Sequence, residues 1–263
     1  LIALGGGVVG DMAGFAAATF KRGINFVNVP TTLLAMVDAS VGGKTGINFG
    51  GLKNEIGAFA FPQTVIIDTQ WLETLDHENL LSGYAEMLKH GLITERKLLP
   101  TLLNFDTATF NLHQLSDMLK VSVAIKEQIV EQDPHEQGIR KALNFGHTFG
   151  HAFEEWAMTR HPILHGYAVA YGMVCELYLS AIKQGFPQTI MRRTVNFIRN
   201  NYGTLPITCD DYDALISLMI HDKKNAGNNI NFSLLHDLGS VVINRTATEE
   251  EIKDALDFLR EGV

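Results

Sequence analysis

The sequence has few cysteines and no long apolar run, and both absences limit the kind of protein it encodes. Cys175 and Cys209 are the only two cysteines among 263 residues, too few for a disulfide framework. We therefore expect both to pack as small apolar side chains in a reducing compartment, the cytoplasm. No uninterrupted apolar run approaches the length of a membrane span, and no signal peptide is visible. The sequence thus predicts a cytoplasmic protein without a membrane partner.

Positive charge is also scarce. The 21 Lys and Arg residues are outnumbered by 29 Asp and Glu residues, which gives a net charge of −8. This balance argues against a nucleic-acid partner but leaves room for a small basic pocket that binds an anionic metabolite. Hydrophobic residues make up 46% and charged residues 19% of the chain, a composition typical of a packed globular protein with one large or two modest domains.

The order of apolar segments predicts an α/β part followed by a helical part. Leu1–Leu4, Ile24–Val29 and Thr64–Asp68 have the composition of buried strands, and Asp11–Phe20 that of a helix, which together indicate a parallel sheet. We expect the Ser40–Gly51 segment to be flexible. Helical periodicity predicts helices over residues 78–93, 112–131, 140–159, 167–183, 188–200, 212–221 and 249–259, and residues 231–235 and 240–243 suggest a hairpin.

These segments divide into two predicted domains. Residues 1–75 form an incomplete Rossmann-like parallel sheet, and residues 76–263 form a mostly α-helical domain. Leu1–Leu4 leads directly into Gly5-Gly6-Gly7 without an initiator Met. We therefore expect the chain to begin inside the sheet of a longer protein.

A glycine-rich turn connects the first predicted strand to the first predicted helix. Gly5, Gly7 and Gly10 have the spacing at which a backbone approaches the diphosphate of a dinucleotide. A tight strand–helix turn without a ligand explains the same pattern equally well. A dinucleotide-binding fold usually has an acidic residue about 20 residues further on for the ribose, yet no Asp or Glu occurs from Met12 to Val37. The ribose of a bound dinucleotide must therefore be held by another group.

Several cations follow the glycine turn. Ser40–Thr45 resembles a phosphate-binding loop but lacks the Walker A spacing. Further along the chain are Lys53-Asn54, Lys89 three residues after Glu86, and Lys126 and Arg140 on either side of an acidic loop. Each of these charges by itself is typical of a solvated side chain or a weak surface ion pair. Together they suggest a small substrate with two anionic groups.

Histidine spacing indicates a metal site. His147 and His151 lie four residues apart within Leu143–His151 and project from one face of a predicted helix. Gly146 and Gly150 lower helix propensity there, which suggests a close approach to the backbone. His165 and Glu86 add donors from two other segments. Two of these imidazoles and the carboxylate would make a three-ligand site that leaves a coordination position open for a substrate. The alternative is a pair of helix histidines that hydrogen-bond to neighbouring groups.

These motifs, in this order, closely resemble the 3-dehydroquinate synthase family, the second enzymes of the shikimate pathway, over almost the whole chain. The matching segments are Gly5–Asp11, Pro30–Ala35, Val37–Thr45, Lys53-Asn54, Ser82–Lys89, Arg140–His151, His165-Gly166 and Asp222–Lys224. The resemblance implies a nucleotide-binding α/β domain, a helical domain, a zinc or cobalt ion and NAD. Three residues depart from the family pattern without being proposed ligands: Ala39, Leu52 and Tyr167.

The resemblance also implies roles for individual residues. The metal ligands would be Glu86, His147 and His165. Contacts to NAD would come from Gly6, Gly7, Val8, Val9, Gly10, Asp11, Thr31, Thr32, Asp38, Lys44, Lys53, Trp71, Leu72, Glu73 and Thr74. Substrate and proton transfer would involve Lys44, Asn54, Lys89, Lys126, Arg140, Asn144 and His151, with Lys223 or Lys224 at the phosphate. Arg22 would reach that phosphate across a homodimer interface.

The implied reaction converts the seven-carbon sugar acid phosphate DAHP into 3-dehydroquinate through NAD-dependent oxidation, phosphate elimination, reduction and aldol closure. Three alternatives remain open. The first is another sugar phosphate cyclase, of the 2-deoxy-scyllo-inosose or valiolone synthase type. The second is a metal-dependent glycerol or alcohol dehydrogenase. The third is an inactive fragment, since we expect the isolated 263-residue chain to be weakly active or inactive.

Overall fold

The computed structural model describes residues 1–49, 52–94, 97–221 and 230–262. The chain forms two compact units: unit 1 contains residues 1–87 and 108–140, and unit 2 contains residues 88–107 and 141–263. Helix α2 (His77–Ile93) runs from unit 1 into unit 2. None of the described helices is long and apolar enough to cross a membrane. The predicted combination of a small parallel sheet with a mostly helical second part is confirmed, whereas the predicted boundary after residue 75 stays a prediction.

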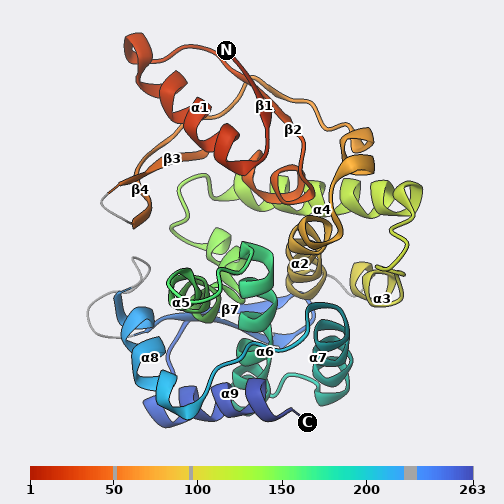
Figure 1. Cartoon of the computed structure of the whole chain (residues 1–263), viewed down its shortest axis with the longest axis vertical. Coiled ribbons are helices and arrows are strands. Elements are labelled where there is room, and N and C mark those ends of the chain that lie inside the picture. Colours follow the sequence, from red (N-terminus) through yellow and green to blue (C-terminus); the bar gives the residue numbers. More distant parts are fainter. Residues whose placement is uncertain (50–51, 95–96, 222–229, 263) are drawn as a thin grey trace. The chain divides into compact units, whose positions relative to one another are not determined.

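Unit 1 contains the parallel sheet. Strands β1 (Ile2–Gly5), β2 (Val27–Pro30) and β5 (Thr64–Val65) pair in the order β1-β2-β5, and Ala3 lies opposite Asn28. Helix α1 (Gly7–Thr19) follows the glycine turn and contacts β1 (Figure 1). The unit also contains η1 (Phe20–Arg22), the π-helical turn η2 (Ala35–Ala39), η3 (Thr69–Thr74) and α4 (Leu112–Gln132). The carboxyl ends of β1 and β2 therefore lead into the glycine turn and towards η2.

Two predictions for unit 1 were wrong. Residues 40–51 are not a flexible segment throughout, because β3 (Lys44–Phe49) pairs antiparallel with β4 (Leu52–Phe59). The strand β3 forms by pairing with β4 later in the chain, so residues 44–49 alone give little indication of a strand. Gly42 and Gly43 just before it suggested a loop. Helix α1 also begins at Gly7 rather than at Asp11, because the glycine-rich stretch supplies the first helical turn despite its low propensity.

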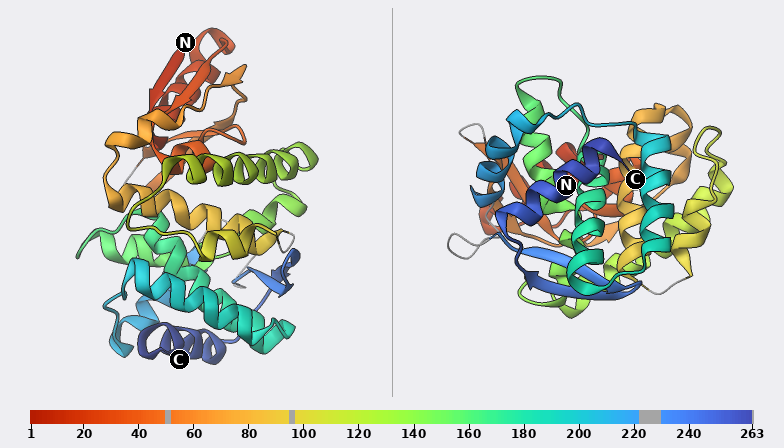
Figure 2. Two further views of the ribbon diagram at one scale, coloured as in Figure 1. Left: turned by 90° about the vertical axis from the view of Figure 1, so that its right-hand side faces the viewer. Right: turned by 90° about the horizontal axis from the view of Figure 1, so that it is seen from below.

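Unit 2 is built around helix α6 (His165–Gln184), which contacts α5 (His147–Met158), α7 (Gln188–Tyr202), α9 (Glu249–Glu261) and β6 (Phe232–Asp237). In Figure 2, α9 is drawn in dark blue near the carboxyl terminus. Strand β6 pairs with β7 (Ser240–Arg245), which confirms the predicted hairpin. The remaining elements are α3 (Leu98–Leu103), which the sequence analysis missed, η5 (Cys209–Asp211) and α8 (Tyr212–His221).

The helix predicted over residues 140–159 is interrupted. The chain forms a 3₁₀ turn, η4 (Ile139–Asn144), and then starts α5 at His147. Between them, Gly146 has a φ of 81°, a left-handed conformation that favours glycine over other residues. The break places His147 at the first position of α5, directly after the turn.

Candidate active site

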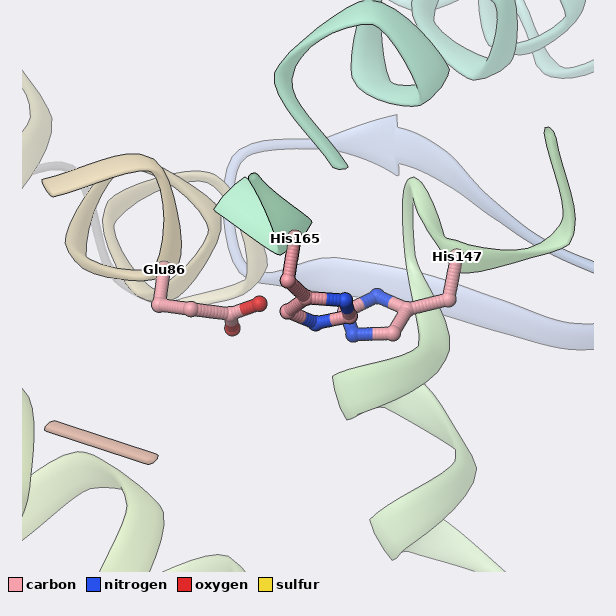
Figure 3. A group of neighbouring side chains, drawn as sticks. All are labelled: Glu86, His147 and His165. Atoms are coloured by element: carbon pink, nitrogen blue, oxygen red, sulfur yellow. The ribbon is translucent and has the colours of Figure 1, made fainter. Parts of the chain in front are cut away.

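Three side chains that are far apart in the sequence form a group able to hold a metal ion. Glu86 lies on α2, His147 is the first residue of α5, and His165 is the first residue of α6. One potential ligand atom from each residue lies within 4.8 Å of the others. Figure 3 shows the carboxylate of Glu86 directed towards the two imidazole rings. One carboxylate oxygen and two imidazole nitrogens are a donor set that suits Zn²⁺ or Co²⁺.

Each histidine of this group has a contact that orients its ring. His147 Nδ1 lies 3.2 Å from the carbonyl oxygen of Phe145, and His165 Nδ1 lies 2.9 Å from Glu154 Oε2. Such contacts select the tautomer in which Nδ1 carries the proton and Nε2 is available to a metal. The two rings are 5.4 Å apart, measured between their centroids. The geometry is thus compatible with Nε2 coordination by both histidines.

His151 lies beside this pair and is not a member of the ligand group. Its ring centroid is 5.4 Å from that of His147 and 6.1 Å from that of His165. His147 and His151 therefore lie close together on one helix, α5, as their spacing predicts. His151 thus adjoins the ligand group without being part of it.

The glycine turn of unit 1 borders a small cavity. Gly6, Gly7 and Gly10 line it from the turn and the first turn of α1, and Ala39 lines it from η2. The α1 amino terminus presents backbone N–H groups that can bind an anion. Thr32 lies next to the turn, since a Cβ added at Gly6 would lie 3.2 Å from Thr32 Cγ2. These predicted cofactor-binding residues are therefore close together.

Two polar residues of this cavity were not predicted to bind a cofactor. Asn28 of β2 is 7% exposed and Ser40 is 5% exposed, and both line the cavity. Within the described parts of the chain, Asn28 Oδ1 and Ser40 Oγ have no hydrogen-bond partner. A buried polar atom without a partner is costly, so a polar group of a bound cofactor fits this cavity. The signal available in the sequence was a lone Asn inside an apolar strand.

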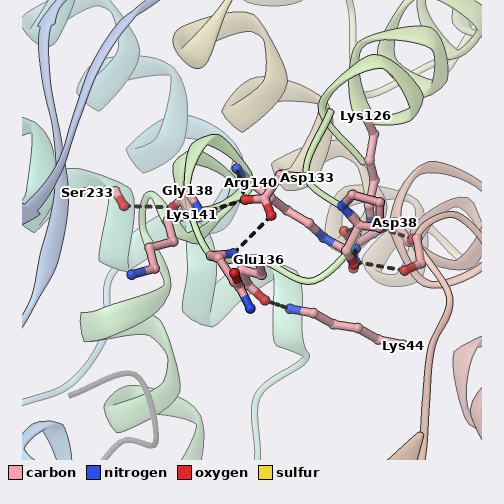
Figure 4. A network of polar contacts seen from close by, with 12 residues as sticks. Asp38, Lys44, Lys126, Asp133, Glu136, Gly138, Arg140, Lys141 and Ser233 are labelled. Carbon is pink, nitrogen blue, oxygen red and sulfur yellow. Dashed lines mark hydrogen bonds and ion pairs between the residues drawn. The ribbon is translucent and has the colours of Figure 1, made fainter. Parts of the chain in front are cut away.

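Two of the predicted cations of unit 1 contact η2 and the segment that follows it. Lys126 of α4 forms an ion pair with Asp38 and also donates to the Asp38 carbonyl oxygen. Arg140 donates through Nη2 to the carbonyl oxygen of Gly42 at 2.9 Å. Both cations are buried, and burial lowers the pKa of Arg140 against the opposing effect of nearby carboxylates. Figure 4 shows this network.

The loop before Arg140 is held by one carboxylate. Asp133 accepts hydrogen bonds from the backbone N–H groups of Gln137, Gly138 and Arg140, at 2.9, 2.7 and 3.1 Å. Desolvation would raise the pKa of Asp133, but these three hydrogen bonds outweigh it and lower the pKa. In the same loop, Glu136 forms an ion pair with Lys44. The loop thus contacts two of the predicted substrate-binding cations.

The other predicted site residues are distributed as follows. Asn54 of β4 lies 3.4 Å from Asp11 of α1, measured from Nδ2 to Oδ2. Lys89 is buried on α2, one turn after Glu86, and Arg22 is exposed at the end of η1. The 71–74 stretch lies on η3 and does not line the described cavity. Val8 and Val9 are exposed, and Asn144 ends η4. Lys53 lies on β4, and Lys223 and Lys224 lie outside the described residues.

The sequence matches two family models. Residues 1–82 match the model described as 3-dehydroquinate synthase N-terminal, and residues 83–225 match the one described as 3-dehydroquinate synthase C-terminal. A 3-dehydroquinate synthase of Parabacteroides distasonis is 56% identical over 263 residues, which cover 100% of this chain and 74% of that protein. A 3-dehydroquinate synthase of Listeria innocua is 43% identical over 100% of this chain and 72% of its own length.

Solved structures share the fold. A 2-epi-5-epi-valiolone synthase of Streptomyces hygroscopicus with NAD⁺ and Zn²⁺ bound superposes with a TM-score of 0.87 at 28% identity, over 98% of this chain and 72% of that one. A 2-deoxy-scyllo-inosose synthase complexed with carbaglucose-6-phosphate, NAD⁺ and Co²⁺ has a TM-score of 0.83 at 27% identity, over 100% and 73% of the two chains. A probable glycerol dehydrogenase of Sinorhizobium meliloti, at 16% identity and a TM-score of 0.60, shares the fold alone.

Proposed function

The chain belongs to the 3-dehydroquinate synthase family, and we propose how its residues divide the work of the family's reaction. It is a lyase of aromatic amino acid and chorismate biosynthesis that converts DAHP into 3-dehydroquinate and phosphate. The observation that carries the assignment of roles is the grouping of Glu86, His147 and His165 within 4.8 Å. Three separate segments have to fold together to produce this group.

NAD and a divalent metal are the cofactors of this enzyme. When bound, NAD accepts and later returns a hydride, and the metal polarises the hydroxyl that is oxidised. Glu86, His147 and His165 hold the metal. The glycine turn of unit 1 holds the diphosphate of NAD at the α1 amino terminus, with Thr32 beside it. The residues present fit both groups.

The remaining residues bind substrate and move protons. His151 accepts the proton of the hydroxyl that is oxidised, because its ring adjoins the ligand pair and is not part of the ligand group. Lys126 and Arg140 bind the carboxylate and hydroxyls of DAHP. Lys44, Asn54, Asn144 and His151, together with one of Lys223 or Lys224, surround the phosphate, and Lys89 also belongs to the substrate-binding residues. The departing phosphate takes the proton next to the new ketone, and positioned cations stabilise its charge.

The proposal extends to assembly and compartment. Arg22 is exposed at the end of η1, a position from which an arginine is available to a second copy of the chain. We therefore place Arg22 at the phosphate of the partner protomer in a homodimer. The compartment is the cytoplasm, in line with the two cysteines, Cys175 and Cys209, both of which are free thiols.

Product analysis tests the proposed function. The purified chain is supplied with zinc, a catalytic amount of NAD and DAHP, and phosphate and 3-dehydroquinate are measured. We expect the two products in equal amounts, even where turnover by the isolated 263-residue chain is weak, and no accumulation of NADH, because the hydride returns to the substrate. Net accumulation of NADH would instead indicate a dehydrogenase.

A second substrate series separates the related cyclases. Glucose 6-phosphate and sedoheptulose 7-phosphate have no carboxylate, so they leave Lys126 and Arg140 without their proposed partner. We expect turnover of DAHP alone. If either carboxylate-free substrate is turned over and DAHP is not consumed, the assignment of these two cations is contradicted.

A further inference from the structure

Glu176 lies on α6 and is fully buried, with 0% of its surface exposed. Its carboxylate reaches the start of α5, where Oε2 accepts a hydrogen bond from the Gly146 N–H at 2.7 Å and Oε1 accepts one from the Thr148 N–H at 3.1 Å. These two N–H groups stand on either side of His147. One carboxylate on a neighbouring helix thus accepts hydrogen bonds from the N–H groups of both residues that flank a proposed metal ligand.

The start of α5 needs such a partner. The first N–H groups of a helix have no acceptor within the helix, and the N-cap residue Gly146 has no side chain to provide one. Gly146, His147 and Thr148 are all buried, so water does not satisfy these groups well. A buried carboxylate is costly unless it is hydrogen-bonded, and the positive end of the α5 dipole offsets its charge.

Close packing of α5 against α6 fixes the distance between the Glu176 backbone and the start of α5. A Cβ added at Gly172 of α6 would collide with the carbonyl oxygen of Gly146, and one added at Gly150 of α5 would lie 3.1 Å from the Ala168 carbonyl oxygen. The backbones of α5 and α6 are therefore in direct contact at this point. Since Glu176 lies one turn after Gly172 on α6, its side chain spans a short and well-defined gap.

We propose that Glu176 is a positioning residue for the metal ligand His147. By binding the N–H groups of Gly146 and Thr148, the residues before and after His147, it sets the direction in which this side chain leaves the helix. The contact of His147 Nδ1 with the Phe145 carbonyl oxygen then fixes the rotation of the ring. This inference rests on the proposed metal site and assigns to Glu176 a role in metal affinity, without direct contact to the metal.

The test compares Glu176→Gln with the unaltered protein and with Glu155→Gln, a matched control at an exposed position of α5. Zinc affinity is measured by competition with a chelator, and the visible absorption of the cobalt-loaded protein reports ligand geometry. Outer groups that orient metal ligands contribute about 10- to 100-fold to metal affinity. We expect Glu176→Gln to lose zinc affinity in this range and to alter the cobalt spectrum, whereas Glu155→Gln changes neither.

A helix cap without influence on the metal would behave differently. It would lower the melting temperature of the metal-free protein and leave zinc affinity and the cobalt spectrum unchanged, which would overturn the proposal. If Glu176→Gln does not fold, Glu176→Asp gives the same test, because it keeps the charge but is too short to reach both amides. Failure of the unaltered protein to bind zinc or cobalt would overturn the metal site, and this inference with it.

Discussion

The Nδ1 atom of His165 lies 2.9 Å from Oε2 of Glu154, so a carboxylate of α5 orients the proposed ligand that begins α6. The contact leaves Nε2 of His165 for the metal and increases the basicity of the ring. Glu154 and Glu176 thus contact the two proposed histidine ligands in different ways, Glu154 at the ring of His165 and Glu176 at the backbone on either side of His147.

Replacing Glu154 by glutamine should weaken metal binding by about tenfold, at the lower end of the range for outer-shell groups, because an amide oxygen still accepts the hydrogen bond. Alanine at this position should weaken it further. Chelator competition with zinc measures both effects, and Glu155→Gln is the control on the same helix. Equal zinc affinity in all of these proteins would show that His165 is oriented by other contacts.

His147 and His151 should respond differently to alanine substitution. His147→Ala removes a proposed ligand, so we expect loss of bound zinc and of turnover together. His151→Ala should retain zinc and lose turnover, because His151 is not a member of the ligand group. The metal content of the purified proteins and the release of phosphate from DAHP measure the two properties. Zinc retention in His147→Ala would contradict the ligand assignment.

Asp133→Asn should destabilise unit 1 in a pH-dependent way. The pKa of Asp133 is lowered from its ordinary value of 3.8, so its contribution to the free energy of unfolding is complete above that value. This contribution declines as the pH falls through the lower pKa of the folded state. Urea unfolding from pH 7 downwards should therefore show a difference between the two proteins that shrinks below about pH 4. Glu127→Gln, at an exposed position of α4, is the control.

Asn28→Leu should weaken NAD binding. The change removes a buried acceptor and keeps a side chain that branches at Cγ with the same number of heavy atoms, and a hydrogen bond of about 1 kcal/mol corresponds to several-fold in affinity. The free energy of unfolding without cofactor should stay equal or rise, because an unsatisfied polar atom disappears. Asn25→Leu, just before β2 at an exposed position, is the control. Unchanged NAD affinity with lower stability of the cofactor-free protein would mean that Asn28 binds an internal water instead.

Local patterns predicted much of this protein. Most helices of unit 2 begin and end within a few residues of their predicted limits, since an amphipathic period is a property of neighbouring residues. Residues 140–159 and the β3–β4 hairpin are exceptions. In the first, Gly146 changes the backbone direction while the apolar period continues. In the second, the pairing of Lys44 with Phe59 depends on residues that are distant along the chain.

In the candidate site, too, some residues were predictable from local sequence and others were not. Motif order in the sequence was sufficient to identify the family and to name Glu86, His147 and His165, because each lies in a short segment of distinctive composition. The supporting groups Glu154, Glu176 and Asn28 had no comparable signal, since an isolated Glu or Asn is common in any helix or strand.

The sequence by itself thus determined the type of chemistry, through the kinds of donor and cation it supplies at recognisable spacings. Only the tertiary structure decided which further carboxylates lie where they can hold the proposed ligands in place. Their placement depends on where α5 and α6 touch, and the contact is made by glycines whose effect appears only when two backbones meet.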